Sequence, residues 1–98
     1  MKNKKILIIE DNPALLELLK NHLEKNGYNV IFEKDGKNGL YTARKEMPDL
    51  TLLDLILPEI DGISILEKIR QDEKTKSLSV IIISNSGQPV EIEKIKNL

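Results

Sequence analysis

The sequence contains no cysteine, and this absence removes several classes of function at once. A disulfide framework, a thiolate nucleophile and a thiolate-ligated metal site are all excluded. Long apolar runs are missing too: none approaches the roughly 20 residues that span a bilayer, and nothing before Ile6 resembles the apolar core of a signal peptide. We therefore expect a cytoplasmic protein that makes no contact with a membrane.

The sequence also has no excess of one charge. Lysine and arginine together number 15, aspartate and glutamate together number 16, and the formal net charge is -1. Because a basic surface is the usual footprint of nucleic-acid binding, we expect no direct contact with nucleic acid. The 98 residues are 40% hydrophobic and 32% charged, and no repeat, low-complexity tract or linker divides them. One domain over residues 1–98 is the expected organisation.

Short apolar runs alternate with longer amphipathic ones, which predicts strands alternating with helices. Strands are expected at residues 6–9, 28–32, 50–53 and 80–83, and helices at residues 13–25, 37–46, 63–72 and 90–97. Asn12-Pro13 is typical of a helix start, and Asn26-Gly27 is typical of a helix end. This alternation predicts an α/β fold with a parallel sheet that carries helices on both faces.

Acidic residues follow two of the predicted strands. Glu10 and Asp11 follow the first strand, Asp54 follows the third, and the hydroxyl of Ser84 follows the fourth. Because ligands of such sheets sit beyond the carboxyl ends of the strands, these side chains are expected to converge. The only histidine, His22, lies on the first predicted helix, so clustered carboxylates favour Mg²⁺ over zinc. A carboxylate that touches Mg²⁺ can attack phosphorus, which makes Asp54 the candidate nucleophile.

These residues, in this order, carry a resemblance to a known family. The matching elements are the acidic pair Glu10-Asp11, Asp54 at 43 positions beyond Asp11, the Asp-x3-Pro-x2-Asp-Gly run that ends at Gly62, and Ser84 at 30 positions beyond Asp54. The chain resembles the receiver domain of two-component response regulators, the relatives of the chemotaxis protein CheY, over essentially its whole length. The resemblance implies a flavodoxin-like, doubly wound sheet with strand order 2-1-3-4, beside which the family has a fifth strand.

The resemblance also implies a function and the residues that perform it. Asp54 would accept a phosphoryl group from a phosphohistidine on a sensor histidine kinase or phosphotransfer protein, without enzymatic turnover. Asp11 and Asp54 would bind Mg²⁺ directly, Glu10 would reach the ion through water, and the backbone carbonyl of Ile56 would complete the protein ligands. Ser84 would hydrogen-bond a phosphoryl oxygen and pull its loop inward.

One departure from the family pattern leaves two interpretations open. The pattern continues with a fifth strand that carries a lysine and with a fifth helix, whereas this sequence ends at Leu98, and Lys94 and Lys96 fall in the predicted fourth helix. The chain is then either a phosphoacceptor or a degenerate, truncated receiver that binds partners without phosphorylation. A sheet that lacks the fifth strand would expose residues 80–83 at an apolar edge, so we also expect self-association through this edge.

Two enzyme classes with related folds do not match the sequence. A dinucleotide-binding enzyme needs Gly-x-Gly-x-x-Gly after the first strand, where Asp11-Asn12-Pro13-Ala14 stands. A phosphatase of the haloacid-dehalogenase type would carry an Asp-x-Asp motif that begins at the nucleophile. Here Ile56 occupies the place of the second acid. We therefore expect no turnover enzyme.

Overall fold

The computed structural model describes residues 4–57 and 60–83, in which strands and helices alternate. In chain order the elements are β1 (Lys5–Ile9), α1 (Pro13–Lys25), β2 (Asn29–Glu33), α2 (Gly36–Glu46), β3 (Leu50–Asp54), α3 (Gly62–Gln71) and β4 (Val80–Ile83). These elements confirm the predicted alternation, and each boundary lies within one residue of its predicted position. The helix predicted at residues 90–97 falls outside the described residues.

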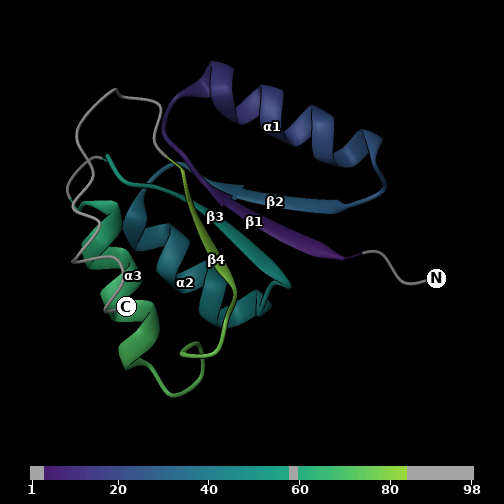
Figure 1. The fold of residues 1–98 in the computed structure, drawn as a ribbon. Coiled ribbons are helices and arrows are strands. Elements are labelled where there is room, and N and C mark those ends of the chain that lie inside the picture. Colours follow the sequence, from purple (N-terminus) through teal and green to yellow (C-terminus); the bar gives the residue numbers. More distant parts are fainter. Residues whose placement is uncertain (1–3, 58–59, 84–98) are drawn as a thin grey trace.

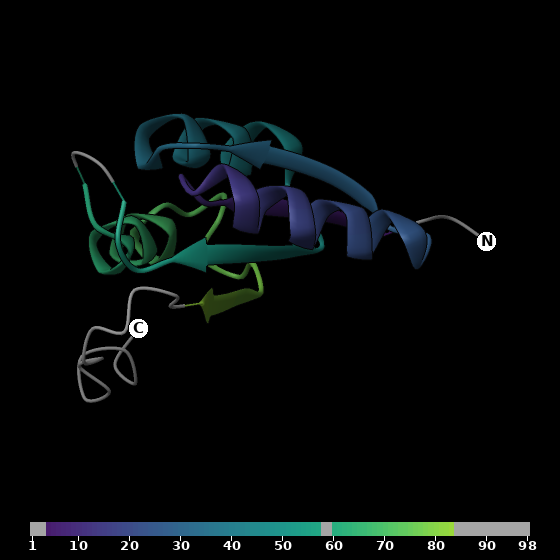
Figure 2. The ribbon, with the colours of Figure 1, turned by 90° about the horizontal axis from the view of Figure 1, so that it is seen from above.

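The four strands form one parallel sheet in the order β2-β1-β3-β4, as the resemblance implied. α1 covers one face of this sheet, and α2 and α3 cover the other (Figure 1). Turning the molecule shows β2 at one edge and β4 at the other (Figure 2). In the ladder between β1 and β3, Ile9 pairs with Leu53, so the next residues, Glu10 and Asp54, emerge side by side.

β1 is buried on both faces, which explains its continuous apolar sequence. Leu7 and Ile9 pack into the core shared with α2 and α3, whereas Ile6 and Ile8 pack into the core on the α1 side. All four side chains are at most 3% exposed. This central strand holds the residues that follow it in a fixed position relative to β3.

Local capping residues set the ends of α1, as the sequence predicted. The side-chain oxygen of Asn12 accepts hydrogen bonds from the backbone N–H groups of Ala14 and Leu15, at 2.9 and 3.2 Å. Gly27, just beyond the helix, has a φ of 89°, a left-handed conformation that glycine adopts without strain. The chain therefore leaves the acidic end of the sheet through a well-capped helix.

The spacing of Leu40, Ala43 and Met47 predicts that they share one inward-facing stripe of the second helix, and this prediction is wrong at Met47. Leu40 and Ala43 pack against the core, but Met47 is 41% exposed. Its φ is 46°, and its backbone N–H closes the helix by donating to the carbonyl of Ala43 at 3.0 Å. The left-handed cap takes Met47 out of helical geometry before Pro48, so its side chain leaves the stripe.

No helix within residues 4–57 and 60–83 is long and apolar enough to cross a membrane.

Candidate functional site at the carboxyl end of the sheet

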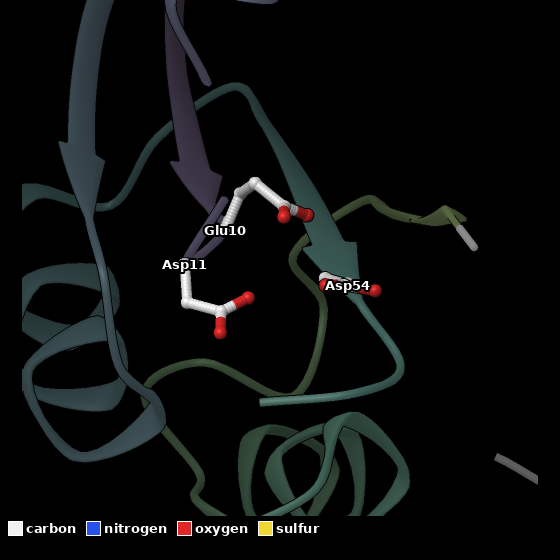
Figure 3. A group of neighbouring side chains, drawn as sticks. All are labelled: Glu10, Asp11 and Asp54. Carbon is white, nitrogen blue, oxygen red and sulfur yellow. The ribbon is translucent and has the colours of Figure 1, made fainter. Parts of the chain in front are cut away.

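Three carboxylates meet where β1 and β3 end. Glu10 and Asp11 directly follow β1, and Asp54 is the last residue of β3. One carboxylate oxygen from each residue lies within 4.8 Å of the others. The side chains of Glu10 and Asp11 extend toward the side on which Asp54 lies (Figure 3). The three acids that the sequence placed at this end of the sheet therefore lie together.

The acids differ sharply in burial. Glu10 is fully buried and Asp54 is 2% exposed, whereas Asp11 is exposed to solvent. The backbone of Glu10 is still bonded to the sheet: its N–H donates to the carbonyl of Glu33 in β2 at 3.1 Å. Asp11 is the next residue along the chain, and its side chain is exposed at the solvent side of the cluster.

One oxygen of Glu10 has no hydrogen-bond partner among the described atoms. Oε1 accepts the backbone N–H of Asn12 at 3.0 Å, but Oε2 is buried and, when Glu10 is ionised, has no donor, because its neighbour Asp54 can share a hydrogen bond with it only while Glu10 is protonated. A buried acceptor without a partner costs about 1–3 kcal/mol. A cation between the three carboxylates would satisfy this oxygen.

Electrostatics at the site favour a positive ion. Burial, with further contributions from the neighbouring Asp54 and Asp11, raises the pKa of Glu10 from 4.5 to about 7, against the opposing effect of the Asn12 N–H. A bound divalent ion would lower the pKa of Glu10 again, because it stabilises the charged form of each carboxylate around it. The donors of the cluster are all carboxylate oxygens, the ligand type that Mg²⁺ prefers. The residues present therefore fit an oxygen-ligated Mg²⁺ ion.

The loop after β3 holds the other predicted ligand. The backbone N–H of Ile56 donates to Oδ1 of Asp54 at 3.2 Å, and the Ile56 side chain is 48% exposed. This bond orients the Asp54 carboxylate relative to the loop. The predicted role of the Ile56 carbonyl as a metal ligand stays a prediction, and Ser84 lies outside the described residues.

Gly62 contributes to the site in a way that sequence reasoning missed. The Asp61-Gly62 pair predicts a turn into the third helix, and α3 does begin at Gly62. The φ of Gly62 is not positive, and glycine is needed there because the start of α3 lies against the end of β3. Its backbone N–H donates to the carbonyl of Leu55 at 2.8 Å, and an added Cβ would overlap the carbonyl oxygen of Asp54. Asp61 caps α3 by accepting the Ser64 N–H at 2.8 Å. The Asp-Gly pair therefore fixes the loop against Asp54.

The raised pKa of Glu10 predicts how stability depends on pH when no divalent cation is present. In the unfolded chain Glu10 loses its proton near 4.5, but in the folded protein it keeps the proton up to about 7. The unfolded state thus binds fewer protons in this window, so the free energy of unfolding should fall by roughly 1–3 kcal/mol as pH rises through it. Urea unfolding in a chelating buffer, at several pH values across the window, measures this slope.

Glu10→Gln should flatten the slope because glutamine does not titrate. Glu17→Gln, which removes an exposed acid from α1, is the matched control and should keep the wild-type slope. Equal slopes for wild type and Glu10→Gln would contradict the assignment of the raised pKa to Glu10.

Known proteins resemble this chain in sequence and in structure. Residues 6–98 match the family described as "Response regulator receiver domain". The alkaline phosphatase synthesis transcriptional regulatory protein PhoP of Bacillus subtilis is 38% identical over 96 residues, which are 98% of this chain. The chain spans 38% of the length of that regulator.

Two solved structures show the same fold. A putative response regulator from Chloroflexus aurantiacus is 29% identical with a TM-score of 0.88, and the match covers 97% of this chain and 79% of that one. The receiver domain of a sensor histidine kinase from Pseudomonas aeruginosa, solved with a magnesium ion in its active-site cleft, is 28% identical with a TM-score of 0.85. That match covers 94% of this chain and 75% of that domain.

Proposed function

The chain belongs to the receiver domain family of two-component response regulators, and on this premise we propose that Asp54 is its phosphoacceptor and that Mg²⁺ is its metal. The observation that carries the proposal is the meeting of Glu10, Asp11 and Asp54 within 4.8 Å, around the unsatisfied oxygen of Glu10. The magnesium ion in the related receiver domain from Pseudomonas aeruginosa supports the choice of metal.

Each acid has a separate task in the proposed reaction. An oxygen of Asp54 forms a bond to phosphorus while the phosphorus–nitrogen bond of a phosphohistidine breaks. The imidazole nitrogen keeps the electron pair and takes up a proton, and Asp54 becomes an acyl phosphate. The Ile56 N–H holds the attacking carboxylate in place. Bound Mg²⁺ would neutralise charge on the phosphoryl oxygens.

Asp11 and Glu10 have different tasks in the proposed binding of Mg²⁺. Asp11 is exposed and lies at the opening, where it can bind the ion as it enters. Glu10 is buried behind it and supplies negative charge, directly or through water, once its proton has left. Mg²⁺ binding should therefore release a proton and strengthen as pH rises through 7.

The positions of two further residues in the family pattern assign them roles in the same site. The backbone carbonyl of Ile56 would complete the protein ligands of the metal, and the hydroxyl of Ser84 would donate a hydrogen bond to a phosphoryl oxygen of the acyl phosphate. Both roles rest on the resemblance. The hydrogen bond from the Ile56 N–H to Oδ1 of Asp54 also supports the role of Ile56, because it holds this residue beside the cluster.

Receiver domains of response regulators interact with histidine kinases or phosphotransfer proteins, and a protein of this kind is the proposed phosphoryl donor. The domain would be an acceptor that takes up one phosphoryl group and not an enzyme with turnover. The cytoplasmic location expected from the sequence stays a prediction.

The proposal extends to self-association at β4. In the part of the chain that the structure describes, β4 pairs with β3 alone, and Ile81 is 50% exposed. An apolar, β-branched edge of this kind favours pairing with a second copy. Sedimentation should show a mass that rises with protein concentration, and Ile81→Lys should lower it because a charged edge resists pairing. A mass that does not change with concentration would contradict self-association.

Intact mass after incubation with Mg²⁺ and acetyl phosphate tests the phosphoacceptor. Wild type should gain a phosphoryl adduct, and Asp54→Asn should gain none because an amide oxygen is a poor nucleophile. Asp61→Asn is the matched control: it neutralises an acid beside the site, and asparagine still caps α3. An adduct that persists in Asp54→Asn would contradict the proposal, and its absence from wild type would favour a module that works without phosphorylation.

A further inference from the structure

A groove follows the outer edge of β2, and none of the three clustered acids lines it. Its volume is about 600 Å³. One wall consists of four consecutive β2 residues, Val30 to Glu33, and the other wall includes Asn38, Tyr41 and Lys45 of α2. Figure 2 shows β2 at this edge of the sheet with α2 beside it. The groove therefore joins an edge strand to one face of a helix.

The edge of β2 is open to another strand. Within the described ranges β2 pairs with β1 alone, so the backbone groups of its outer side have no strand partner there. Edge strands are usually guarded by lysine, proline or a bulge, but the sequence of β2 is Asn-Val-Ile-Phe-Glu. Phe32 is 42% exposed, and the carboxylate of Glu33 is held by the Thr42 hydroxyl at 2.6 Å. This edge has the features that strand addition requires.

The α2 wall adds an aromatic ring and a positive charge. Asn38, Tyr41 and Lys45 are spaced by three and four residues, which places them on one face of the helix. Tyr41 is 66% exposed, and the ammonium of Lys45 lies 6.0 Å from the centre of its ring. The nearby acid Glu46 is already paired with Lys5 at 2.9 Å.

A second hollow shares Tyr41 and Lys45 with the groove and is lined mainly by cationic side chains. It has a volume of about 220 Å³ and is lined by Tyr41, Arg44, Lys45 and Lys74, without a carboxylate. Asp72 lies beside it and accepts hydrogen bonds from Nε of Arg44 at 2.9 Å and from the backbone N–H of Lys74 at 2.9 Å. Over the groove and this hollow together, the cations Lys5, Lys45, Arg44 and Lys74 outnumber the acids Glu33, Glu46 and Asp72 by one. Because Lys5 is paired with Glu46, the excess of positive charge lies at the hollow, next to the open edge.

We propose that this face binds an extended acidic segment of a partner protein. The main chain of the segment adds to the outer edge of β2, and its acidic side chains contact Lys45, Arg44 and Lys74. Peptide fits better than nucleic acid because the open strand edge presents both N–H donors and C=O acceptors. A peptide backbone satisfies both kinds of group, whereas a phosphate backbone carries no N–H donor for the carbonyls of β2.

The test uses a fluorescently labelled peptide in which a Val-Thr repeat is followed by a run of glutamates. Anisotropy titration of the full chain should show saturable binding that weakens at high salt. Replacing the glutamates of the peptide with glutamine should weaken binding, and N-methylating alternate residues of the repeat should abolish it. Both changes leave the length and the apolar content of the repeat nearly the same.

Protein variants locate the binding surface. Lys45→Gln and Lys74→Gln should each weaken binding about three-fold, and the double variant about ten-fold, because the contacts are exposed ion pairs. Lys68→Gln removes an exposed lysine of α3 outside both hollows and should leave affinity unchanged. Unchanged affinity in the double variant would overturn the proposal. So would tight binding of an oligothymidylate together with none of the peptide, or no binding of either probe.

Discussion

Replacing Gly62 with alanine is expected to lower the free energy of unfolding by about 3 kcal/mol. An added Cβ would overlap the carbonyl oxygen of Asp54 and lie 2.6 Å from the Cα of Leu55. Both are backbone atoms, so no side-chain rotation can relieve the overlap, and α3 must move away from β3. Urea unfolding followed by circular dichroism measures the loss.

Gly27→Ala is the matched control for this prediction. Gly27 has a φ of 89°, but a Cβ there would meet nothing within 4 Å. Its substitution should cost about 1 kcal/mol, from backbone conformation alone. A Gly62→Ala variant as stable as Gly27→Ala would contradict the close approach of α3 to Asp54. Because Gly62 lies against the residue proposed to accept phosphate, its substitution should also weaken Mg²⁺ binding.

Replacing Asp11 with asparagine is expected to weaken Mg²⁺ binding by about ten-fold or more and to slow phosphorylation of Asp54 to a similar degree. Asp11 is exposed, and none of the hydrogen bonds described above depends on its carboxylate. The variant should therefore unfold at nearly the same urea concentration as wild type when no divalent cation is present. Titration calorimetry with Mg²⁺ measures the affinity.

Asp61→Asn again serves as the control, since it removes one negative charge near the site without touching the cluster. Its Mg²⁺ affinity should stay within about three-fold of wild type, as expected of a screened surface charge. Equal losses in Asp11→Asn and Asp61→Asn would mean that general charge, and not a specific ligand, determines Mg²⁺ binding.

The sequence predicted the frame of the site because its signals are local. The run of four apolar residues from Ile6 to Ile9 identified a strand, and Asn12-Pro13 identified the helix that follows it. Acids at two strand ends were then enough to expect a cluster, because parallel strands end at the same edge. The described structure places Glu10, Asp11 and Asp54 in that cluster.

The features that the sequence did not predict depend on contacts between distant segments. Glu10 is fully buried at the end of a strand whose partner β2 also binds its backbone, and the need for glycine at position 62 comes from the backbone of Asp54. The exposure of Met47 comes from a left-handed cap that hydrophobic periodicity does not encode. The groove beside Phe32 exists because β2 lies at an edge of the sheet, which only the strand order determines.

The central claim, that Asp54 itself carries the phosphoryl group, is tested most directly by trapping the acyl phosphate. Borohydride reduces an acyl phosphate to an alcohol, which converts a phosphorylated aspartate into homoserine, whereas a phosphorylated glutamate gives a longer side chain. Peptide mapping after treatment with Mg²⁺, acetyl phosphate and borohydride should find homoserine at position 54 and unmodified Glu10 and Asp11. Reduction at Glu10 or Asp11 with Asp54 intact would contradict the claim, and so would a protein without any reduced residue.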